Sequence, residues 1–344
     1  MIWQDLSETP VVPPQQAPGV TPIPGARLTP TIFRGQTADW EAVRAAQQSP
    51  QAALAYLSAC ASSVPAEVWV GPAESKGRFF YTEDLSGLNF ERRLAALPEI
   101  IAALVKALAG RSSQSIFAGA VNLARHVPGL ADQVPMALLP EDQHRLTSLW
   151  IGTSSRTAAH WDYSDNLACP VLGTRTFLLF PPEALPDLYL GPIDWTPAGQ
   201  PVSMVDCEQP DLARYPRYAQ ALERAQVARL APGDALFIPS MWFHYVLSPE
   251  PVGAQVNFWW HQGSARRLPP MNSLMHALLT LRDASPDERD AWRIVFDHFV
   301  FGDPAAVMAH LPPSAQGVLD PENEAAADHL RKQLDATSLG TRSR

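Results

Sequence analysis

Alternating apolar and polar positions divide this chain into parts with different predicted secondary structure. Between residues 149 and 263, short apolar runs recur with turn-forming residues between them, at Gly173, Pro181-Pro182, Pro232-Gly233 and Pro249 to Gly253. Short strands separated by such turns are typical of a β-sandwich or β-barrel. On both sides of this stretch the apolar residues follow helical spacing, which predicts flanking helices.

The first 115 residues are predicted to form an arm and a mixed helix and strand extension. Residues 1–30 carry seven prolines, a density that excludes a helix or a central strand and predicts an extended arm. The strands predicted beyond the arm cover Thr31–Gly35, Val68–Val70, Arg78–Tyr81 and Ser115–Gly119, and the predicted helices cover 38–47, 50–61 and 90–109, the last broken or kinked near Pro98.

After Gly263 the pattern becomes helical again. Helices are predicted over Met271–Arg282, Pro286–Phe301 and 322–335, and Ser285 followed by a proline and two acidic residues is typical of a helix start. The chain is therefore predicted to contain a proline-rich arm, a helix and strand extension, a β core that carries the candidate chemistry and a helical region, over residues 1–30, 31–115, 116–263 and 264–344.

Composition narrows the class of protein further. The 344 residues are 46% hydrophobic, enough for a substantial core, and the net charge of −9 with no run of Lys or Arg disfavours a nucleic-acid partner. Cys60, Cys169 and Cys207 form no CxxC pair, which favours reduced thiols and a cytoplasmic protein. The sequence shows no export signal and no run of about 18 apolar residues, so no membrane association is expected.

The candidate chemistry centres on His160-Trp161-Asp162. Residues i and i+2 of a strand point to the same face, so this imidazole and carboxylate can bind one metal ion from a single strand. A third ligand is expected from a later strand that follows the turn Ala231–Asp234 and ends at His244. Two histidines and one carboxylate with open positions opposite are the ligand set of non-haem Fe(II) oxygenases. A single HxD pattern is short, and a histidine on a strand is more often structural, so the surrounding residues decide.

Two blocks of sequence carry a family resemblance. The first runs from Thr157 through His160-Trp-Asp162 and Asn166 to Gly173-Thr-Arg175, and the second from Ala231–Asp234 through His244 to Val256–Trp259. Together they resemble the Jumonji-C-type, cupin-like 2-oxoglutarate oxygenases, and within these most closely the branch that contains the asparaginyl hydroxylase inhibiting hypoxia-inducible factor. The resemblance covers about residues 149–263. It implies a mostly β fold with flanking helices and a double-stranded β-helix, or jelly-roll, core.

The resemblance also implies roles for individual residues. In the family, the two histidines and the aspartate hold Fe(II), and 2-oxoglutarate and O2 are co-substrates; here the ligands would be His160, Asp162 and His244. Thr157 matches a family threonine that binds the distal carboxylate of 2-oxoglutarate, while Arg175 stands where the family has a lysine. A guanidinium can take a carboxylate through two hydrogen bonds, so co-substrate binding can survive this change. The remaining matches are Asn166 and Asn257, which line the family site, and Phe117, which falls where the family often has a tyrosine, a role that Tyr81 or Tyr163 could fill.

The resemblance favours an Fe(II)- and 2-oxoglutarate-dependent oxygenase that hydroxylates a protein or peptide side chain, with a small molecule or tRNA as lesser options. Two rivals stay open: a non-catalytic cupin-like binding module, which Arg175 and Phe117 would favour, and a metal-dependent cupin such as an isomerase, which would show a fourth protein ligand. The C-terminal helices resemble those through which relatives form homodimers, although Leu278, Trp292 and Phe296 could instead pack on the chain's own barrel. We expect His261 to be a surface residue.

Overall fold

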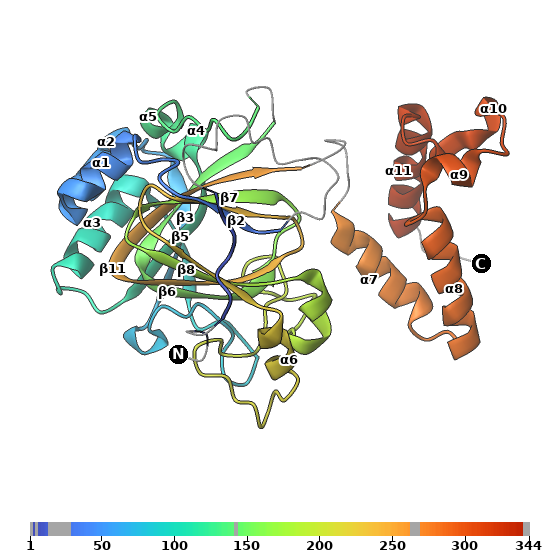
Figure 1. Cartoon of the computed structure of the whole chain (residues 1–344), viewed down its shortest axis with the longest axis horizontal. Helices are drawn as coiled ribbons and strands as arrows, with labels where there is room; N and C mark the ends of the chain where they lie inside the picture. The colour runs from blue at the N-terminus through green and yellow to red at the C-terminus, as the bar shows by residue number, and fades with distance from the viewer. Residues whose placement is uncertain (1–2, 4–5, 13–28, 141–143, 262–268, 340–344) are drawn as a thin grey trace. The chain divides into compact units, whose positions relative to one another are not determined.

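A computed structural model describes residues 3, 6–12, 29–140, 144–261 and 269–339 of the chain. The chain forms two compact units, Met1–Ser264 and Ala265–Arg344. The first unit holds a large, almost entirely antiparallel sheet with helices beside it, the architecture expected of a cupin jelly-roll core (Figure 1). In the described part of the chain, no helix has the length and apolar composition needed to cross a membrane.

The sheet contains eleven strands, and its longest two lie side by side. The strands are β1 Val11–Val12, β2 Thr31–Phe33, β3 Pro65–Gly71, β4 Glu91–Ala96, β5 Ser115–Asn122, β6 Leu146–Trp161, β7 Asp165–Leu172, β8 Arg175–Phe180, β9 Gln226–Leu230, β10 Ala235–Ile238 and β11 Phe243–Trp260. They follow the order β1-β2-β10-β7-β11-β6-β5-β3-β4, and β8 joins β11 to β9.

Strand β11 holds the core together because it changes partners along its length. Over its first five residues it pairs with β8, and from Ala254 onward it pairs with β7, while β6 accompanies both halves. The pairing with β6 shifts register once near His244 and once between Ser248 and Val252, which are bulges that bend a long strand. The sheet therefore curves around an interior lined by alternate residues of β6 and β11.

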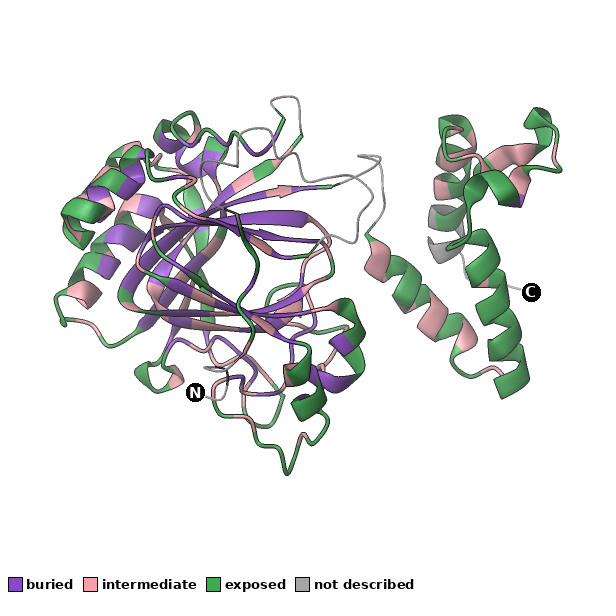
Figure 2. Cartoon of the chain, in the orientation of Figure 1, coloured by how far each residue is buried: buried purple, intermediate pink, exposed green. Residues whose placement is uncertain are grey.

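Helices cover the outer face of this sheet with apolar side chains. Leu54, Leu57 and Leu104 pack in one cluster with Leu149 and Val256 of the two long strands, and all five are fully buried. Figure 2 shows that the strands of this unit are mostly buried. The helices of the first unit are α1 Glu41–Gln48, α2 Pro50–Cys60, α3 Leu97–Leu108, α4 Leu123–His126, α5 Pro128–Ala131 and α6 Tyr218–Glu223, with short 3₁₀ turns at Ala73–Ser75 and Pro182–Asp187.

Two predictions of secondary structure were wrong. Residues 91–96 form β4, paired with β3, and only Leu97–Leu108 of the predicted helix 90–109 is helical. Pro98 is the second residue of this helix and does not kink it, because a proline in the first turn loses no helical hydrogen bond. The predicted strand Arg78–Tyr81 is irregular apart from a single bridge between Tyr81 and Leu88.

The described residues of the N-terminal arm lie along the core. Val11 and Val12 pair with β2, Glu8 bridges to Val227, and the buried Trp3 indole donates a hydrogen bond to the carbonyl of Cys207 at 2.8 Å. Residues 13–28, which carry most of the prolines, lie outside the described residues. The three cysteines are free thiols.

The second unit is helical, as predicted. Its elements are α7 Pro270–Leu281, α8 Pro286–Phe299, α9 Pro304–Met308, α10 Pro313–Gln316, a 3₁₀ turn at Gly317–Leu319, and α11 Glu324–Leu339. The predicted start at Ser285 is confirmed, because its hydroxyl accepts a hydrogen bond from the backbone N–H of Glu288. No residue of α7 or α8 is buried, and Figure 2 shows both helices largely exposed.

Candidate metal and co-substrate site

The three predicted metal ligands come from neighbouring strands. His160 lies on β6, Asp162 follows the last residue of β6, and His244 is the second residue of β11. The register of the two strands places His244 directly opposite His160. Cross-strand partners share a face of the sheet, so both imidazoles point to the same side.

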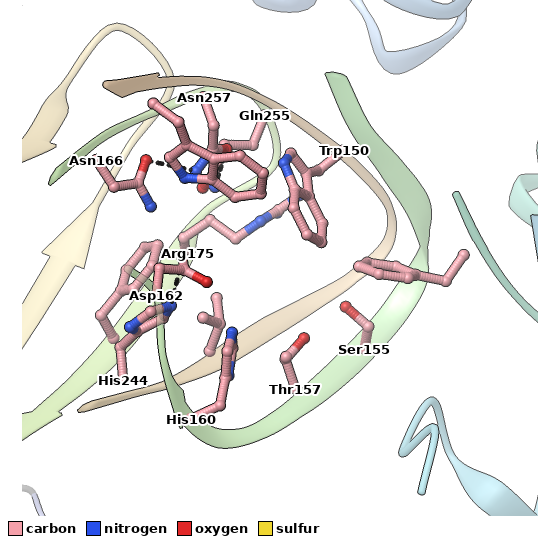
Figure 3. Close-up of a pocket in the computed structure, with 14 residues that line it drawn as sticks. Trp150, Ser155, Thr157, His160, Asp162, Asn166, Arg175, His244, Gln255 and Asn257 are labelled. Atoms are coloured by element: carbon pink, nitrogen blue, oxygen red, sulfur yellow. Dashed lines mark hydrogen bonds and ion pairs between the residues drawn. The ribbon is translucent and has the colours of Figure 1, made fainter. Parts of the chain in front are cut away.

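The structure brings the three side chains together. One potential ligand atom from each lies within 4.8 Å of the other two, the distance expected of groups that can hold one metal ion. The imidazole centroids are 4.4 Å apart, and His244 Nε2 lies 3.6 Å from Asp162 Oδ2. Figure 3 shows the three residues converging at one end of a pocket. In the described part of the chain no fourth His, Cys, Asp or Glu joins this group.

Backbone carbonyls fix the orientation of both imidazoles. Nδ1 of His160 lies 2.9 Å from the carbonyl oxygen of Ala158, and Nδ1 of His244 lies 3.2 Å from that of Trp242. A carbonyl only accepts, so Nδ1 is the donor in both rings and Nε2 is the atom of each ring left to bind a metal.

Burial also affects the protonation state of the His244 imidazole. Its imidazole is 4% exposed, and burial together with the adjacent His160 lowers its pKa to about 4. The ring is therefore neutral at pH 7, which is the form that binds a metal. Two imidazoles oriented through their Nδ1 atoms and one carboxylate fit a non-haem Fe(II) ion, and the absence of thiolates from this group disfavours a structural zinc site.

A pocket with about 500 Å³ of empty volume extends inward from these ligands. It contains every residue to which the sequence assigned a co-substrate role, together with residues that the sequence did not single out. The lining residues are Phe117, Trp150, Ser155, Thr157, His160, Asp162, Asn166, Arg175, Phe177, His244, Val246, Gln255, Asn257 and Trp259. Thr157 lies on β6 three residues before His160, and the two side chains lie beside each other along this strand (Figure 3).

Arg175 is a buried cation that has no ion pair in the described part of the chain. It begins β8, is 6% exposed, and donates one hydrogen bond, from Nη1 to the carbonyl of Thr174 at 2.9 Å. Burial lowers its pKa to about 10 and the nearby Glu250 carboxylate raises it, so the guanidinium stays charged at pH 7. A buried charge without a partner is costly, and the remaining N–H groups are available to an anionic ligand.

Three amide side chains form a row along the wall of the pocket that lies across from His160 and Thr157 (Figure 3). Gln255 Nε2 donates to Asn257 Oδ1 at 2.7 Å, and Asn257 Nδ2 donates to Asn166 Oδ1 at 2.9 Å. These two bonds fix the orientation of each amide, which leaves the Asn166 NH2 group as the donor at the end of the row. At the other end, Gln255 Oε1 is buried without a hydrogen-bond partner within the described structure.

Phe117 lines the pocket as part of an aromatic cluster. Its ring lies 5.7 to 5.8 Å from those of Phe79, Trp69 and Trp150. Neither tyrosine considered as a substitute lines this pocket: the Tyr81 hydroxyl donates to the carbonyl of Trp195, and Tyr163 lines a second cavity. The described part of the chain therefore places no tyrosine hydroxyl in the pocket.

That second cavity, which we call the outer cleft, shares His160, Asp162, Trp150 and Trp259 with the inner pocket and has about 1260 Å³ of empty volume. Two of the three candidate metal ligands, His160 and Asp162, thus line both spaces. The other residues of the outer cleft are Glu67, Trp69, Arg92, Gly119, Ala120, Tyr163, Ser164, Ala198, Gly199, Gln200 and His261. His261 is exposed, as expected, with Nε2 3.3 Å from Ser164 Oγ, but it also lines this cleft.

Sequence reasoning missed Gln255 and Trp150, and it placed Trp259 at the end of the block Val256–Trp259 without giving it a role in the site. Gln255 lies two residues before Asn257 on β11, so the alternation of a strand would have placed both on the same face. Trp150 and Trp259 are 5.6 Å apart in a T-shaped arrangement, and the indole N–H of Trp259 is buried without a partner among the described residues.

A jelly-roll core whose strands carry the candidate metal ligands is typical of the cupin class of proteins. The chain belongs to the family described as the cupin-like domain, whose model matches residues 26–266. It is 36% identical to lysine-specific demethylase JMJ31 of Arabidopsis thaliana over 157 residues, which are 43% of this chain and 28% of that protein.

Two human proteins are similar over shorter stretches. HSPB1-associated protein 1 is 38% identical over 115 residues, 33% of this chain and 23% of that protein. The tRNA wybutosine-synthesizing protein 5 is 39% identical over 101 residues, 29% of each chain. The matches thus span less than a third of these relatives. The closer likeness to the asparaginyl hydroxylase stays a prediction.

Proposed function

We propose that this chain is an Fe(II)- and 2-oxoglutarate-dependent oxygenase that hydroxylates a protein or peptide side chain. One observation carries the proposal: two imidazoles and a carboxylate converge beside a pocket that contains Arg175, a buried guanidinium with no ion pair among the described residues, and two of the three ligands also line the outer cleft. The inner pocket suits an anionic co-substrate and the outer cleft suits the group to be oxidised.

His160 Nε2, His244 Nε2 and the Asp162 carboxylate would hold the metal. When bound, Fe(II) supplies the redox chemistry that couples oxidative decarboxylation of 2-oxoglutarate to succinate and CO2 with insertion of one oxygen atom into a C–H bond. Hydrogen bonds from the two Nδ1 atoms to backbone carbonyls orient both imidazoles, so that their Nε2 atoms face the proposed metal position. Because these side chains are already oriented, metal binding costs less conformational entropy.

For the co-substrate we assign the distal carboxylate of 2-oxoglutarate to Arg175 and Thr157. Arg175 is charged and lacks an ion pair in the described chain, and a guanidinium can hold a carboxylate through two parallel hydrogen bonds. The NH2 group of Asn166, oriented by Asn257, is a further donor beside the metal ligands. Four indole and phenyl rings, of Phe117, Trp150, Phe177 and Trp259, complete the walls and limit the entry of water.

The outer cleft supports a protein or peptide as substrate. Arg92 lines it from β4, an edge strand of the sheet whose residues Glu91–Leu94 are exposed. An extended peptide can add to such an edge and deliver one side chain to the cleft. The net charge of −9 and the Glu67 carboxylate at the cleft disfavour RNA, although one relative's name refers to tRNA modification.

We further propose that the protein is a homodimer through α7 and α8. Leu278, Trp292 and Phe296 line an apolar groove between these helices with about 930 Å³ of empty volume. Ile294 and Phe299 are more than half exposed on α8. Exposed apolar surface of this extent marks an interaction site, and a second copy presents the same surface.

Calorimetry with Mn(II) and 2-oxoglutarate, followed by a succinate-release assay, tests the assigned class. We expect 2-oxoglutarate to bind only when the metal is present and succinate to form with iron and O2. Binding without any succinate, even in the presence of lysate proteins, would favour the non-catalytic binding module. Failure to bind both metal and keto acid would refute the proposal.

The substrate class has a separate test. Lysate proteins incubated with the iron-loaded enzyme and 2-oxoglutarate should gain about 16 Da at specific side chains, the mass of one oxygen atom. Loss of a methyl group in place of this gain would identify a demethylase. Modification confined to the tRNA fraction would identify RNA as the substrate. An Asp162→Ala variant is the control, since it lacks a proposed metal ligand.

A further inference from the structure

The guanidinium of Arg175 lies directly against the backbone of β11 at Gly253. A Cβ atom built on Gly253 would stand 2.6 Å from Arg175 Nη1 and 2.8 Å from Nη2, well inside van der Waals contact. The other glycine at this level, Gly152 on β6, faces Gly253 in the register of the two strands, but its Cβ would meet the carbonyl oxygen of Ile116 and the ring and backbone of Phe117. Gly253 alone makes room for the cation.

Backbone conformation does not explain the glycine. Gly253 is not among the residues with positive φ, so any L residue can adopt its backbone angles. What a side chain at this position would displace is the far end of one flexible side chain, Arg175, and no backbone atom is among its three closest contacts. The fold should therefore tolerate a methyl group here, at the expense of the guanidinium's position.

The same strand builds the rest of the pocket wall. Gly253, Gln255 and Asn257 alternate along β11 and share one face, with the amide row at the metal end and Arg175 at the other. Arg175 is held from its own strand by the Thr174 carbonyl, and the hydroxyl of Thr174 donates to Glu250 Oε1 at 2.5 Å, which holds that carboxylate nearby. Gly253 supplies the remaining side of the cradle.

We propose that Gly253 is a positioning residue for the co-substrate: because it has no side chain, the Arg175 guanidinium can lie flat on β11 and aim its free N–H groups along the pocket. This inference rests on the proposed 2-oxoglutarate-dependent function. A methyl group at this position pushes the guanidinium off β11 and into the space that the distal carboxylate needs.

A double-mutant cycle on the full chain tests the inference by calorimetry with 2-oxoglutarate and Mn(II). Gly253→Ala should raise the Kd for 2-oxoglutarate by about 10-fold or more, the equivalent of one charge-assisted hydrogen bond, and leave Mn(II) binding unchanged. Arg175→Lys should also raise it, since an ammonium lacks the fork. The combined variant should bind no more weakly than Arg175→Lys alone, because a lysine has no Nη atoms to meet the added methyl. Gly87→Ala, whose Cβ has 3.7 Å of clearance, is the matched control.

Each result of these measurements either supports or overturns the inference about Gly253. Wild-type affinity in Gly253→Ala, or effects that add in the combined variant, would overturn the inference. A crystal structure of Gly253→Ala gives a readout that needs no ligand: the guanidinium should have left β11, and an unmoved guanidinium would also overturn it. A moved guanidinium in a protein whose wild type fails to bind 2-oxoglutarate would instead count against the proposed function.

Discussion

Single side chains set the polarity of the pocket through the hydrogen bonds that fix them. In the amide row, Gln255 donates to Asn257 and Asn257 donates to Asn166, so Gln255 decides which atom Asn166 presents at the metal end of the row. Amide groups linked by hydrogen bonds polarise one another. Removing the group at one end of such a chain therefore breaks its own bond and also weakens the others. The row therefore depends on a glutamine that does not touch the metal ligands.

Gln255→Met should destabilise the protein and weaken co-substrate binding. The change leaves the buried Asn257 Oδ1 without its donor, which costs about 1 kcal/mol, the lower end of the usual range because it also removes the unpartnered Gln255 Oε1. Urea unfolding of the metal-free protein measures the stability. Gln48→Met, at an exposed position on α1, is the control, and equal stability of the two variants would contradict the prediction.

The sequence sufficed for residues whose spacing alone defines their geometry. His160 and Asp162 are two positions apart on or beside one strand, and a strand places such residues on the same face. Alternation along β11 could have placed Gln255 beside Asn257, but the role of Gly253 could not be read in this way, because it depends on Arg175 of another strand lying against it. That information is contained in the register between β6, β8 and β11.

At the level of elements, the spacing of apolar residues predicted the strands and helices that pack mainly against one neighbouring element. Residues 91–96 were assigned to a helix because they continue into an Ala- and Leu-rich stretch, whereas they pair with residues 65–70 of β3. Tertiary pairing of this kind overrides local propensity. Boundaries marked by specific chemistry, such as Ser285-Pro286, were predictable because the capping group and the helix start are adjacent in sequence.

Ser285→Ala should loosen the start of α8. The hydroxyl accepts from the N–H of Glu288, and loss of such a cap costs about 0.5–2 kcal/mol. Hydrogen exchange at the first-turn amides of α8 should accelerate, while amides of β6 should not change. Ser314→Ala, at an exposed serine, provides the comparison. Equal exchange in both variants would show that Ser285 does not cap the helix in solution.

At the level of the whole molecule, the two units differ in how much apolar surface they bury. The first has an extensive core, whereas α7 and α8 bury no residue. A helix pair of this length gains most of its stability from packing, so a further surface is needed to cover it. The sequence showed the apolar residues of these helices but not the surface that packs against them.

The paired substitution Leu278→Glu and Trp292→Glu should convert the proposed dimer to a monomer. Two buried carboxylates in an apolar interface would be unpaired, and such burial is strongly unfavourable. Light scattering coupled to size-exclusion chromatography measures the mass. Val318→Glu, an exposed apolar position that does not line the groove, should leave the mass unchanged. A monomeric wild-type protein would show that the apolar residues of α7 and α8 pack elsewhere.

The placement of the candidate ligands on the two longest strands has a thermodynamic consequence. An ion held between His160 and His244 would be a reversible cross-link between segments that are distant in the chain, and it would bind the folded state alone. At a free metal concentration 100-fold above Kd, such linkage raises the unfolding free energy by about 2.7 kcal/mol. Scanning calorimetry with Mn(II) should show an upward shift in Tm that EDTA reverses and that His160→Ala lacks, while His310→Ala retains it. The ion would then add to the free energy of unfolding of the barrel as well as support its reaction.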